Sequence, residues 1–432
     1  MNIVHLVPGS GGGFYCQNCL RDHALIKALR RLNHQAVLVP MYLPILAEDS
    51  GIHNGVPVFY GAINLYLQQK LPFFRRAPRW LTAMLDSPRL LRWAARKAGS
   101  TRARGLEDMT LAMLRADQTH QVLELERLIA WLAAGDRPDV IHFSNLLLLG
   151  LAQRIKNELK VPIVCSVQDE DTWIDAMEPG AAGQAWDILA EKAAAVDLFI
   201  GASRYYAEVI RTRLGLGAER IRVVPVGIDL EGRVPGPLSF DPPTVGFLSR
   251  MAESLGLGLL IDAFLILKRD PRLRGLKLRA TGGQTADDRR FLAGQRRKLA
   301  ARGCVDDVEF LAEFSVARRG EFLRSLSVLS VPAPKGEAFG TYLIEAWAEG
   351  VPVVQPKLGA YPELLEATGG GLLYEPNNAE ALASALAALL LDPDRARQLG
   401  QQGRRAVAER FDIETAARQL AAIYTGLRPL ES

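Results

Sequence analysis

Short apolar runs alternate along the chain with longer segments in which apolar residues recur every three or four positions. In the first half, the short runs predict strands at residues 3–7, 36–39, 140–143, 163–167, 198–200 and 222–224. The intervening segments have helical spacing, for example at Leu25, Ile26, Leu29 and Leu32. Strands that are apolar on both faces and are separated by helices are typical of a parallel sheet that is covered on both sides.

The alternation stops after residue 224 and then starts again. Gly227 and a group of prolines mark the interruption, and these prolines are Pro225, Pro235, Pro237, Pro242 and Pro243. Beyond them, apolar runs predict strands at residues 245–248, 276–280, 308–311, 328–331, 351–354 and 372–374. Because 432 residues are too many for one hydrophobic core, we predict two α/β domains, at residues 1–230 and 231–412. A last helix at residues 413–424 follows Asp412, which is a suitable N-cap.

Composition excludes several classes of protein. Hydrophobic residues make up 49% and charged residues 23% of the chain, as in ordinary globular proteins. The formal net charge of +4 is too small to favour a nucleic-acid partner. The N-terminus runs directly into an apolar strand without an export signal, and no apolar run approaches the ~18 residues of a membrane span. Four cysteines are too few for a disulfide framework, so we expect a cytoplasmic protein.

Residues 65–110 fit neither half of this pattern. Between Lys70 and Arg104 the chain has ten basic residues and one acidic residue, Asp86, with aromatic and other apolar residues among them. We predict an insertion in the first domain that is helical in part. One interpretation is a solvated basic surface, and the other is peripheral contact with anionic lipid at the inner face of a membrane.

The segment 335–354 contains the residues with the clearest chemical meaning, and it reads KGEAFGTYLIEAWAEGVPVV. After a predicted strand, Gly340 permits a close approach and a helix begins near Thr341. The free amides and the positive end of such a helix attract phosphate. Glu337 in the loop and Glu345 in the first turns can hold sugar hydroxyls on either side of a diphosphate. The alternative is an acidic first turn that stabilises an ordinary helix.

This stretch resembles the motif of the retaining family-four glycosyltransferases of the GT-B fold, in which Glu-x-Phe-Gly is followed by a second Glu eight positions after the first. The similarity continues through residues 350–354, 359–363 and 371–374, and it also covers residues 203–229. The resemblance implies two Rossmann-like domains that face each other across a cleft, with residues 413–432 packing back on the first domain.

The resemblance also implies roles for individual residues. It implies that Glu345 binds the ribose hydroxyls of a nucleotide-sugar donor, that Glu337 holds hydroxyls of the transferred sugar, and that Arg250 neutralises the diphosphate. Glu337 and Arg250 are thereby the implied catalytic residues. The further implied donor contacts come from loops and from the helix N-terminus, and they are Gly12, Gly13, Gly282, Phe314, Phe339, Gly340, Thr341 and Tyr342.

Two positions depart from the family pattern. Leu255 stands where the family usually has a lysine that shares the charge of the diphosphate, and Gln168 stands where it tends to have a histidine. We expect another cation to compensate for the lysine, and of Lys335 and Lys357 we prefer Lys335. Because glutamine can still hydrogen-bond a sugar hydroxyl, Gln168 and the following Asp169 are candidate contacts for the acceptor or the sugar.

Three further residues each have two interpretations. His142, at a strand end, either contacts an acceptor or is a hydrogen-bonded core residue. Cys16 and Cys19 have CxxC spacing, and a zinc site would need four ligands. For these cysteines we favour structural packing over a redox pair.

The residues and the resemblance together predict a hexosyltransferase of carbohydrate biosynthesis that uses a nucleotide diphosphate sugar. The acceptor is a sugar, a lipid or a small molecule, and the transfer retains configuration. No Asp-x-Asp stands where a divalent ion would be expected, so we predict neither a metal nor a cofactor. Two alternatives remain, namely a non-catalytic GT-B protein that binds a nucleotide sugar and regulates a partner, and a GT-B sugar epimerase. Leu255 and Gln168 favour the first, whereas the paired Glu337 and Glu345 favour transfer over epimerisation.

Overall fold

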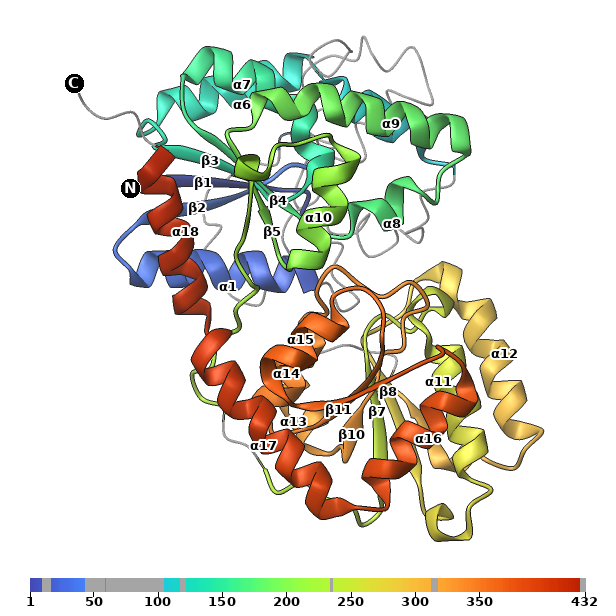
Figure 1. Ribbon diagram of the computed structural model, residues 1–432. Coiled ribbons are helices and arrows are strands. Elements are labelled where there is room, and N and C mark those ends of the chain that lie inside the picture. Colours follow the sequence, from blue (N-terminus) through green and yellow to red (C-terminus); the bar gives the residue numbers. More distant parts are fainter. Residues whose placement is uncertain are drawn as a thin grey trace. The chain divides into compact units, whose positions relative to one another are not determined.

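The computed structural model describes residues 1–9, 17–42, 59, 105–116, 122–233, 236–311 and 318–427. The chain forms two compact units (Figure 1). The first comprises Met1–Gly12, Asn18–Pro225 and Ala416–Ser432, and the second comprises Gly13–Gln17 and Val226–Thr415. Most of the predicted insertion at 65–110 lies outside the described residues, and its described end enters helix α5 (Glu107–Leu114).

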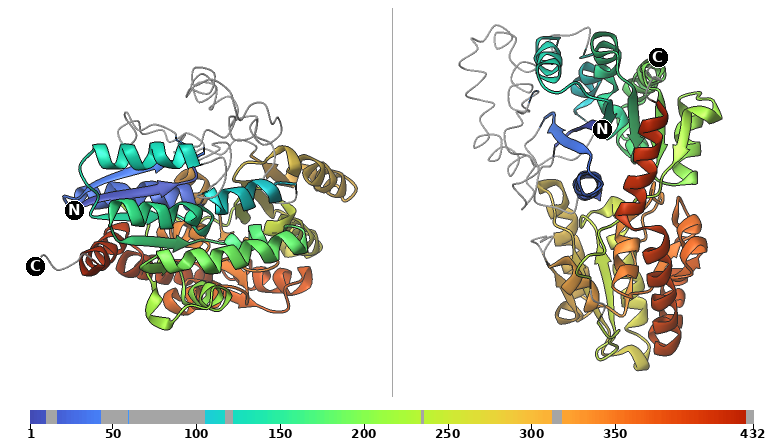
Figure 2. Two further views of the ribbon diagram at one scale, coloured as in Figure 1. Left: turned by 90° about the horizontal axis from the view of Figure 1, so that it is seen from above. Right: turned by 90° about the vertical axis from the view of Figure 1, so that its left-hand side faces the viewer.

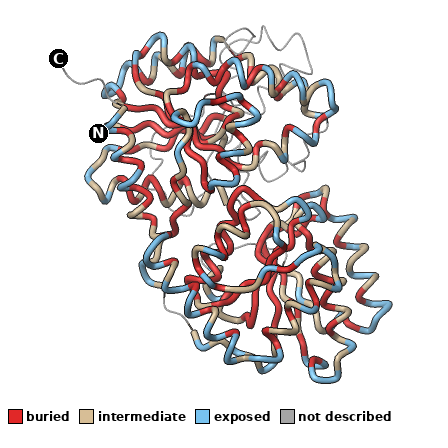
Figure 3. Tube along the Cα trace, in the orientation of Figure 1, coloured by how far each residue is buried: buried red, intermediate tan, exposed pale blue. Residues whose placement is uncertain are grey.

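The first unit contains a six-stranded parallel sheet with the order β2-β1-β3-β4-β5-β6. Its strands are β1 (Asn2–Val7), β2 (Gln35–Pro40), β3 (Val140–Phe143), β4 (Ile163–Val167), β5 (Leu198–Gly201) and β6 (Ile221–Val223). Every residue of β3, β4 and β5 is buried, as expected for strands covered on both faces (Figure 3). The parallel sheet that the apolar runs predicted is therefore confirmed.

Helices surround this sheet, and they are α1 (Gln17–Arg31), α5, α6 (Val122–Ala134), α7 (Ala152–Leu159), α8 (Glu170–Ile174), α9 (Pro179–Lys192), α10 (Arg204–Arg213) and α18 (Ile413–Leu427). Helices α1 and α7 lie on opposite sides of the strands (Figure 1), because their right-handed crossovers run in opposite directions along the sheet. Helix α18 begins after Asp412, whose Oδ1 accepts a hydrogen bond from the Glu414 amide at 3.3 Å. Its Tyr424 contacts His142 of β3, so α18 lies beside the sheet of the first unit (Figure 2).

The second unit repeats this design with the strand order β12-β11-β10-β7-β8-β9. Its strands are β7 (Thr244–Leu248), β8 (Lys277–Thr281), β9 (Val308–Phe310), β10 (Val328–Leu329), β11 (Val353–Pro356) and β12 (Gly371–Tyr374). In each sheet the order reverses direction once, between β1 and β3 in the first and between β7 and β10 in the second. Open α/β sheets bind ligands at the carboxyl ends of the strands beside such a reversal.

The helices of the second unit are α11 (Leu257–Leu267), α12 (Arg289–Ala300), α13 (Arg319–Arg324), α14 (Thr341–Ala348), α15 (Tyr361–Thr368), α16 (Ala379–Leu390) and α17 (Pro393–Arg410). Helix α16 packs against α11, and α17 packs against α14 and α15. Two glycines of α17 permit this contact. An added Cβ atom on Gly403 would lie 2.4 Å from Cδ1 of Trp347 in α14, and one on Gly400 would lie 2.0 Å from the Gly350 carbonyl oxygen. The face of α14 that contacts α17 is therefore tightly packed.

Candidate functional site

The carboxyl ends of β7 and β10 lie at the reversal point of the second sheet. Arg250 follows β7 by two residues, and the loop that carries Glu337 follows β10. Gly282 and Gly283 follow β8, and the Gly283 carbonyl accepts a hydrogen bond from the Met251 amide at 2.9 Å. Three of the segments predicted to contact a donor are thus brought to one edge of one sheet.

The loop after β10 is held by the loop after β11. The Ala360 amide donates a hydrogen bond to the Glu337 carbonyl oxygen at 3.0 Å. Gly359 has a φ angle of 58°, and an added Cβ atom there would lie 2.7 Å from the Glu337 amide nitrogen. Because only glycine allows this close crossing, Gly359 sets the backbone position of Glu337.

Helix α14 begins at Thr341, as predicted, and Gly340 precedes it with a left-handed φ angle of 88°. The Thr341 amide donates to Oε1 of Gln17 at 2.6 Å, and Nε2 of Gln17 donates to Oε2 of Glu337 at 2.9 Å. Gln17 is the first residue of α1, and it belongs to the second unit, whereas the rest of that helix belongs to the first. A side-chain amide therefore occupies the Thr341 N–H in this structure, at a position where the resemblance implied a phosphate.

Glu337 is buried beside the start of α14, and burial raises the pKa of its carboxyl to about 7, although hydrogen bonds with Gln17 and Tyr342 lower it. The hydroxyl of Tyr342 lies 2.7 Å from that of Tyr361, which donates to the Val331 carbonyl oxygen at 3.3 Å. A carboxyl group that titrates near neutral pH at the ligand-binding edge of a sheet is a candidate for function.

Glu345 is almost completely buried in α14. Arg319, the first residue of α13, places its Nε atom 3.2 Å from Oε1 of Glu345. The sequence alone pointed to Glu345 and did not reveal Arg319, because the two residues lie on different helices that only the packing of α13 against α14 brings together.

The cations near this edge differ in what they contact. Arg250 Nε lies 3.9 Å from a carboxylate oxygen of Asp288. Leu255 is half-buried in a 3-10 turn at Glu253–Leu255. Lys335 is exposed, whereas Lys357 pairs with a surface glutamate at 3.3 Å. An exposed pair of this kind is weak, so the choice of Lys335 over Lys357 stays a prediction.

In the first unit, the turn after β4 is organised around the buried Glu170. Its carboxylate accepts hydrogen bonds from the amides of Leu146 (3.0 Å) and Gln168 (2.6 Å) and from the Tyr206 hydroxyl (3.0 Å). Burial raises the pKa of Glu170, although these hydrogen bonds lower it. Gln168 donates from Nε2 to the Ser144 carbonyl oxygen. Glu170, which the sequence did not single out, thereby connects the segments that follow β3 and β4 with helix α10.

Asp169 and His142 have different surroundings. Asp169 is half-buried with a φ of 58°, a left-handed backbone that is uncommon outside glycine and often occurs at functional sites. His142 is completely buried, with Nδ1 2.5 Å from the Tyr424 hydroxyl and Nε2 2.8 Å from the Ser166 hydroxyl. Burial lowers the pKa of His142 well below its ordinary value. These contacts favour the core interpretation of His142 and leave Asp169 as a candidate contact.

Both units match models of known protein families. Residues 108–231 match the model described as Glycosyltransferase Family 4, and residues 233–406 match the model described as Glycosyl transferases group 1. The two models together cover most of the chain, which supports a glycosyltransferase of the group 1 and family-four-like type. The family that its motif predicted is therefore confirmed.

Curated relatives of this glycosyltransferase include two mannosyltransferases. It is 31% identical to the lipopolysaccharide core biosynthesis mannosyltransferase LpsB of Rhizobium meliloti, over 44% of this chain and 54% of the relative. It is 27% identical to the MMP alpha-(1->4)-mannosyltransferase of Mycolicibacterium hassiacum, over 66% of this chain and 70% of the relative. The chain spans about half the length of most of the curated relatives that it matches.

Solved structures share the fold of this glycosyltransferase. Sucrose-phosphate synthase from Thermosynechococcus elongatus has a TM-score of 0.72 at 18% identity, over 99% of both chains. HepE from Anabaena, in a complex with UDP, has a TM-score of 0.68 at 18% identity, over 99% of this chain and 100% of that chain. The predicted GT-B class of the two α/β units is therefore confirmed.

Several predicted residues of this glycosyltransferase lie outside the described part of the chain, namely Gly12, Gly13, Cys16 and Phe314. Cys19 is disulfide-bonded, so our preference for simple packing at this residue was wrong. None of the helices in the described ranges is both long and apolar enough to cross a membrane. The same ranges hold no cluster of three or more His, Cys, Asp or Glu side chains that could hold a metal ion.

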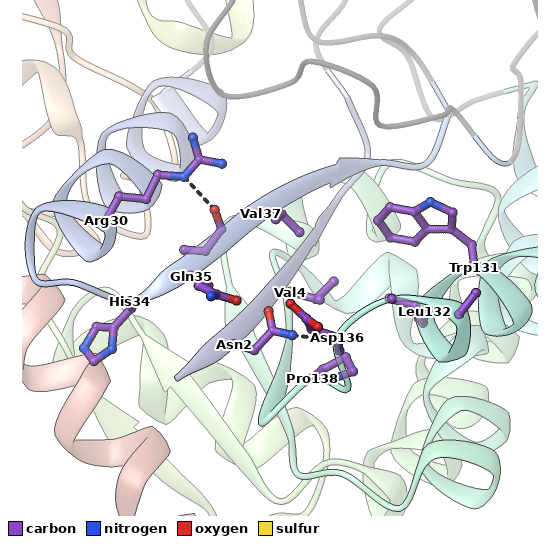
Figure 4. A pocket seen from close by; sticks show the side chains of 13 residues that line it. Asn2, Val4, Arg30, His34, Gln35, Val37, Trp131, Leu132, Asp136 and Pro138 are labelled. Carbon is purple, nitrogen blue, oxygen red and sulfur yellow. Dashed lines mark hydrogen bonds between the residues drawn. The ribbon is translucent and has the colours of Figure 1, made fainter.

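A cavity of about 590 Å³ opens in the first unit at the amino ends of β1 and β2 (Figure 4). Its lining includes Asn2, Gln35, Trp131 and Arg30, whose Nε atom donates to the Ala36 carbonyl oxygen at 2.7 Å. The candidate residues follow the carboxyl ends of the strands instead, so this cavity is separate from the candidate site.

Proposed function

We propose that this protein transfers a hexosyl group from a nucleoside diphosphate sugar to a hydroxyl group of an acceptor, with retention of configuration. The observation that carries the proposal is the pair of buried carboxylates around α14, with Glu337 before the helix and Glu345 in its second turn. A buried carboxylate requires hydrogen-bonding or charged partners. The ribose and the transferred sugar of such a donor would supply hydroxyl groups on both sides of the helix N-terminus.

In this proposal the donor lies along the carboxyl edge of the second sheet. Glu345 accepts hydrogen bonds from the ribose, Glu337 accepts them from the transferred sugar, and the amides that open α14 hold the distal phosphate. The phosphate would displace Gln17 from the Thr341 amide, because one N–H group cannot satisfy both acceptors.

The reaction breaks the bond between the anomeric carbon and the distal phosphate oxygen, and it forms a bond from that carbon to the acceptor oxygen, whose proton passes to the leaving diphosphate. The leaving diphosphate carries about two negative charges, of which Arg250 and the helix N-terminus together offset about one and a half. Lys335 is our candidate for the remainder, in place of the cation that is absent at Leu255. Charges that are already oriented before reaction stabilise the transition state most effectively.

The acceptor would bind the first unit beside Gln168 and Asp169, on the turn that Glu170 holds. Relatives named as mannosyltransferases, and D-inositol 3-phosphate glycosyltransferases such as that of Streptomyces griseus, suggest the first compounds to test. They support mannosyl and related hexosyl donors, together with hydroxyl-rich sugars or lipids as acceptors. A cytoplasmic location and contact with anionic lipid stay predictions.

Removal of the ribose contact tests the proposal. Even one hydrogen bond to a charged carboxylate contributes about 1.5–3 kcal/mol, so Glu345→Ala should weaken the affinity for UDP, GDP or ADP by at least about tenfold. Isothermal titration calorimetry measures this change, and Glu366→Ala, at an exposed position of α15, is the control. Unchanged affinity in Glu345→Ala would show that the nucleotide lies elsewhere.

A non-catalytic nucleotide-sugar-binding protein is the second candidate, and Leu255 favours it because the diphosphate then lacks a second cation. Incubation of the parent protein with a panel of nucleotide sugars and acceptors separates the two candidates. Tight nucleotide binding with neither donor hydrolysis nor transfer would support the non-catalytic candidate. Release of an altered sugar without any acceptor would indicate an epimerase.

A further inference from the structure

The guanidinium group of Arg319 makes fewer hydrogen bonds than its N–H donors allow. Its side chain is 13% exposed, and its Nε atom lies 3.2 Å from Oε1 of Glu345. Among the described residues, neither Nε nor Nη1 has a well-aligned hydrogen-bond acceptor, although both atoms are buried. A buried N–H group without an acceptor costs free energy. This guanidinium is therefore suited to receive an oxygen atom from a ligand.

A second ion pair, between α13 and the residue that follows α14, provides the contrast. Arg324 of α13 donates from Nη1 to Oε2 of Glu349 at 2.9 Å, and Oε1 of Glu349 lies 3.2 Å from Nη1 of Arg233. Arg324 is 37% exposed, so its other N–H groups can reach water. The Arg324 guanidinium therefore has its partners in the protein and in water. The Arg319 guanidinium is buried and keeps N–H donors without an acceptor among the described residues.

We infer that Arg319 is a nucleotide-binding residue, which orients the Glu345 carboxylate toward the ribose and donates from Nη1 to an oxygen atom of the same nucleoside. The inference rests on the proposed function, in which Glu345 binds the ribose. A planar guanidinium has five N–H donors, so it can contact Glu345 on one side and a ligand on the other. Removal of one partner from a buried pair leaves the other charge uncompensated, so loss of Arg319 disturbs Glu345 as well.

The test compares Arg319→Leu and Arg319→Lys with the control Arg324→Leu, which removes the neighbouring pair from the same helix. Isothermal titration calorimetry measures the affinity of each protein for UDP, GDP and their 2′-deoxy counterparts. Thermal unfolding shows whether each variant folds. The ratio of ribonucleotide to deoxyribonucleotide affinity reports on the contact with the ribose, which a purely structural ion pair does not affect.

The parent should bind its ribonucleotide at least about tenfold more tightly than the 2′-deoxy form. In Arg319→Leu the ribonucleotide affinity should fall by at least about tenfold and the ratio should approach one. Arg324→Leu should keep the parent's affinity and ratio. Arg319→Lys keeps the charge but loses the planar guanidinium, so its affinity and ratio should lie between those of the parent and of Arg319→Leu. The lysine variant serves as the test if the leucine variant does not fold.

Parent-like affinity and ratio in both Arg319 variants would overturn the inference and leave the proposed function intact. An equal loss in Arg324→Leu would also overturn it, because the effect would then come from the packing of α13. A parent that binds nucleotide without any preference for ribose would overturn the role of Glu345, and the inference about Arg319 would fail with it.

Discussion

Replacement of Glu337 with glutamine should stabilise the protein, although it removes a proposed contact with the substrate. Burial raises the pKa of this carboxyl from 4.5 to about 7 in the native state. In the unfolded chain the carboxyl is solvated and keeps its ordinary pKa. Between these two pKa values the native state binds more protons than the unfolded state, so the free energy of unfolding falls as the pH rises through this window.

The size of the effect follows from the two pKa values. Their difference corresponds to about 3 kcal/mol, since each pKa unit is worth about 1.4 kcal/mol. The loss of unfolding free energy is nearly complete at pH 8 and small at pH 5, so the two conditions should differ by about 2–3 kcal/mol. Glutamine has a similar shape and no charge, so Glu337→Gln should be more stable than the parent by about 3 kcal/mol at pH 8 and by less than about 1 kcal/mol at pH 5.

Urea unfolding of the parent and of Glu337→Gln at both pH values measures this difference. Glu366→Gln, which removes an exposed carboxyl from α15, controls for the change in net charge. A stabilisation that is equal at pH 5 and pH 8, or that is absent at pH 8, would refute the reasoning. Donor turnover by Glu337→Gln should fall in the same samples, because the proposed sugar contact is weakened.

Two other predictions concern the loop crossing and the acceptor side. Gly359→Ala should destabilise the protein by about 1–3 kcal/mol, because of its positive φ and the nearby Glu337 amide. Urea unfolding measures the loss, and Gly275→Ala is the control, because an added Cβ atom there meets nothing within 4 Å. Equal stability of the two variants would contradict the close contact between Gly359 and Glu337. Glu170→Ala should raise the KM for the acceptor substrate more than the Kd for the nucleotide, because the turn after β4 loses the carboxylate that accepts its hydrogen bonds. Glu170→Gln should have an intermediate KM. An equal change in both constants would contradict the proposed acceptor position.

Much of the fold could be predicted from the sequence because the relevant signals are local. Strands β3 and β4 are buried on both faces, so each appears as an unbroken apolar run. The start of α14 was also predictable, since Gly340 and the following helical residues are adjacent in the chain. The spacing alone left the role of Glu337 and Glu345 open, and the resemblance to the family motif pointed to them as candidate donor contacts.

Contacts between distant segments could not be predicted in this way. Arg319 meets Glu345 only because two helices pack together. Glu170 appears in the sequence as the middle of three acidic residues, and only its burial distinguishes it from its neighbours. The place of His142 in the core likewise depends on Tyr424, which arrives from the far end of the chain.

The two glycines of α17 that face α14 restrict how this protein can be engineered for heat resistance. A glycine inside a helix is usually an attractive target, because alanine there gains about 0.5–1 kcal/mol. At Gly400 and Gly403 the same exchange would force a methyl group against the Gly350 carbonyl oxygen and the Trp347 ring, and α14 would have to move with it. Gly294 of α12, where an added Cβ atom meets nothing within 4 Å, is the safer first position for such a design.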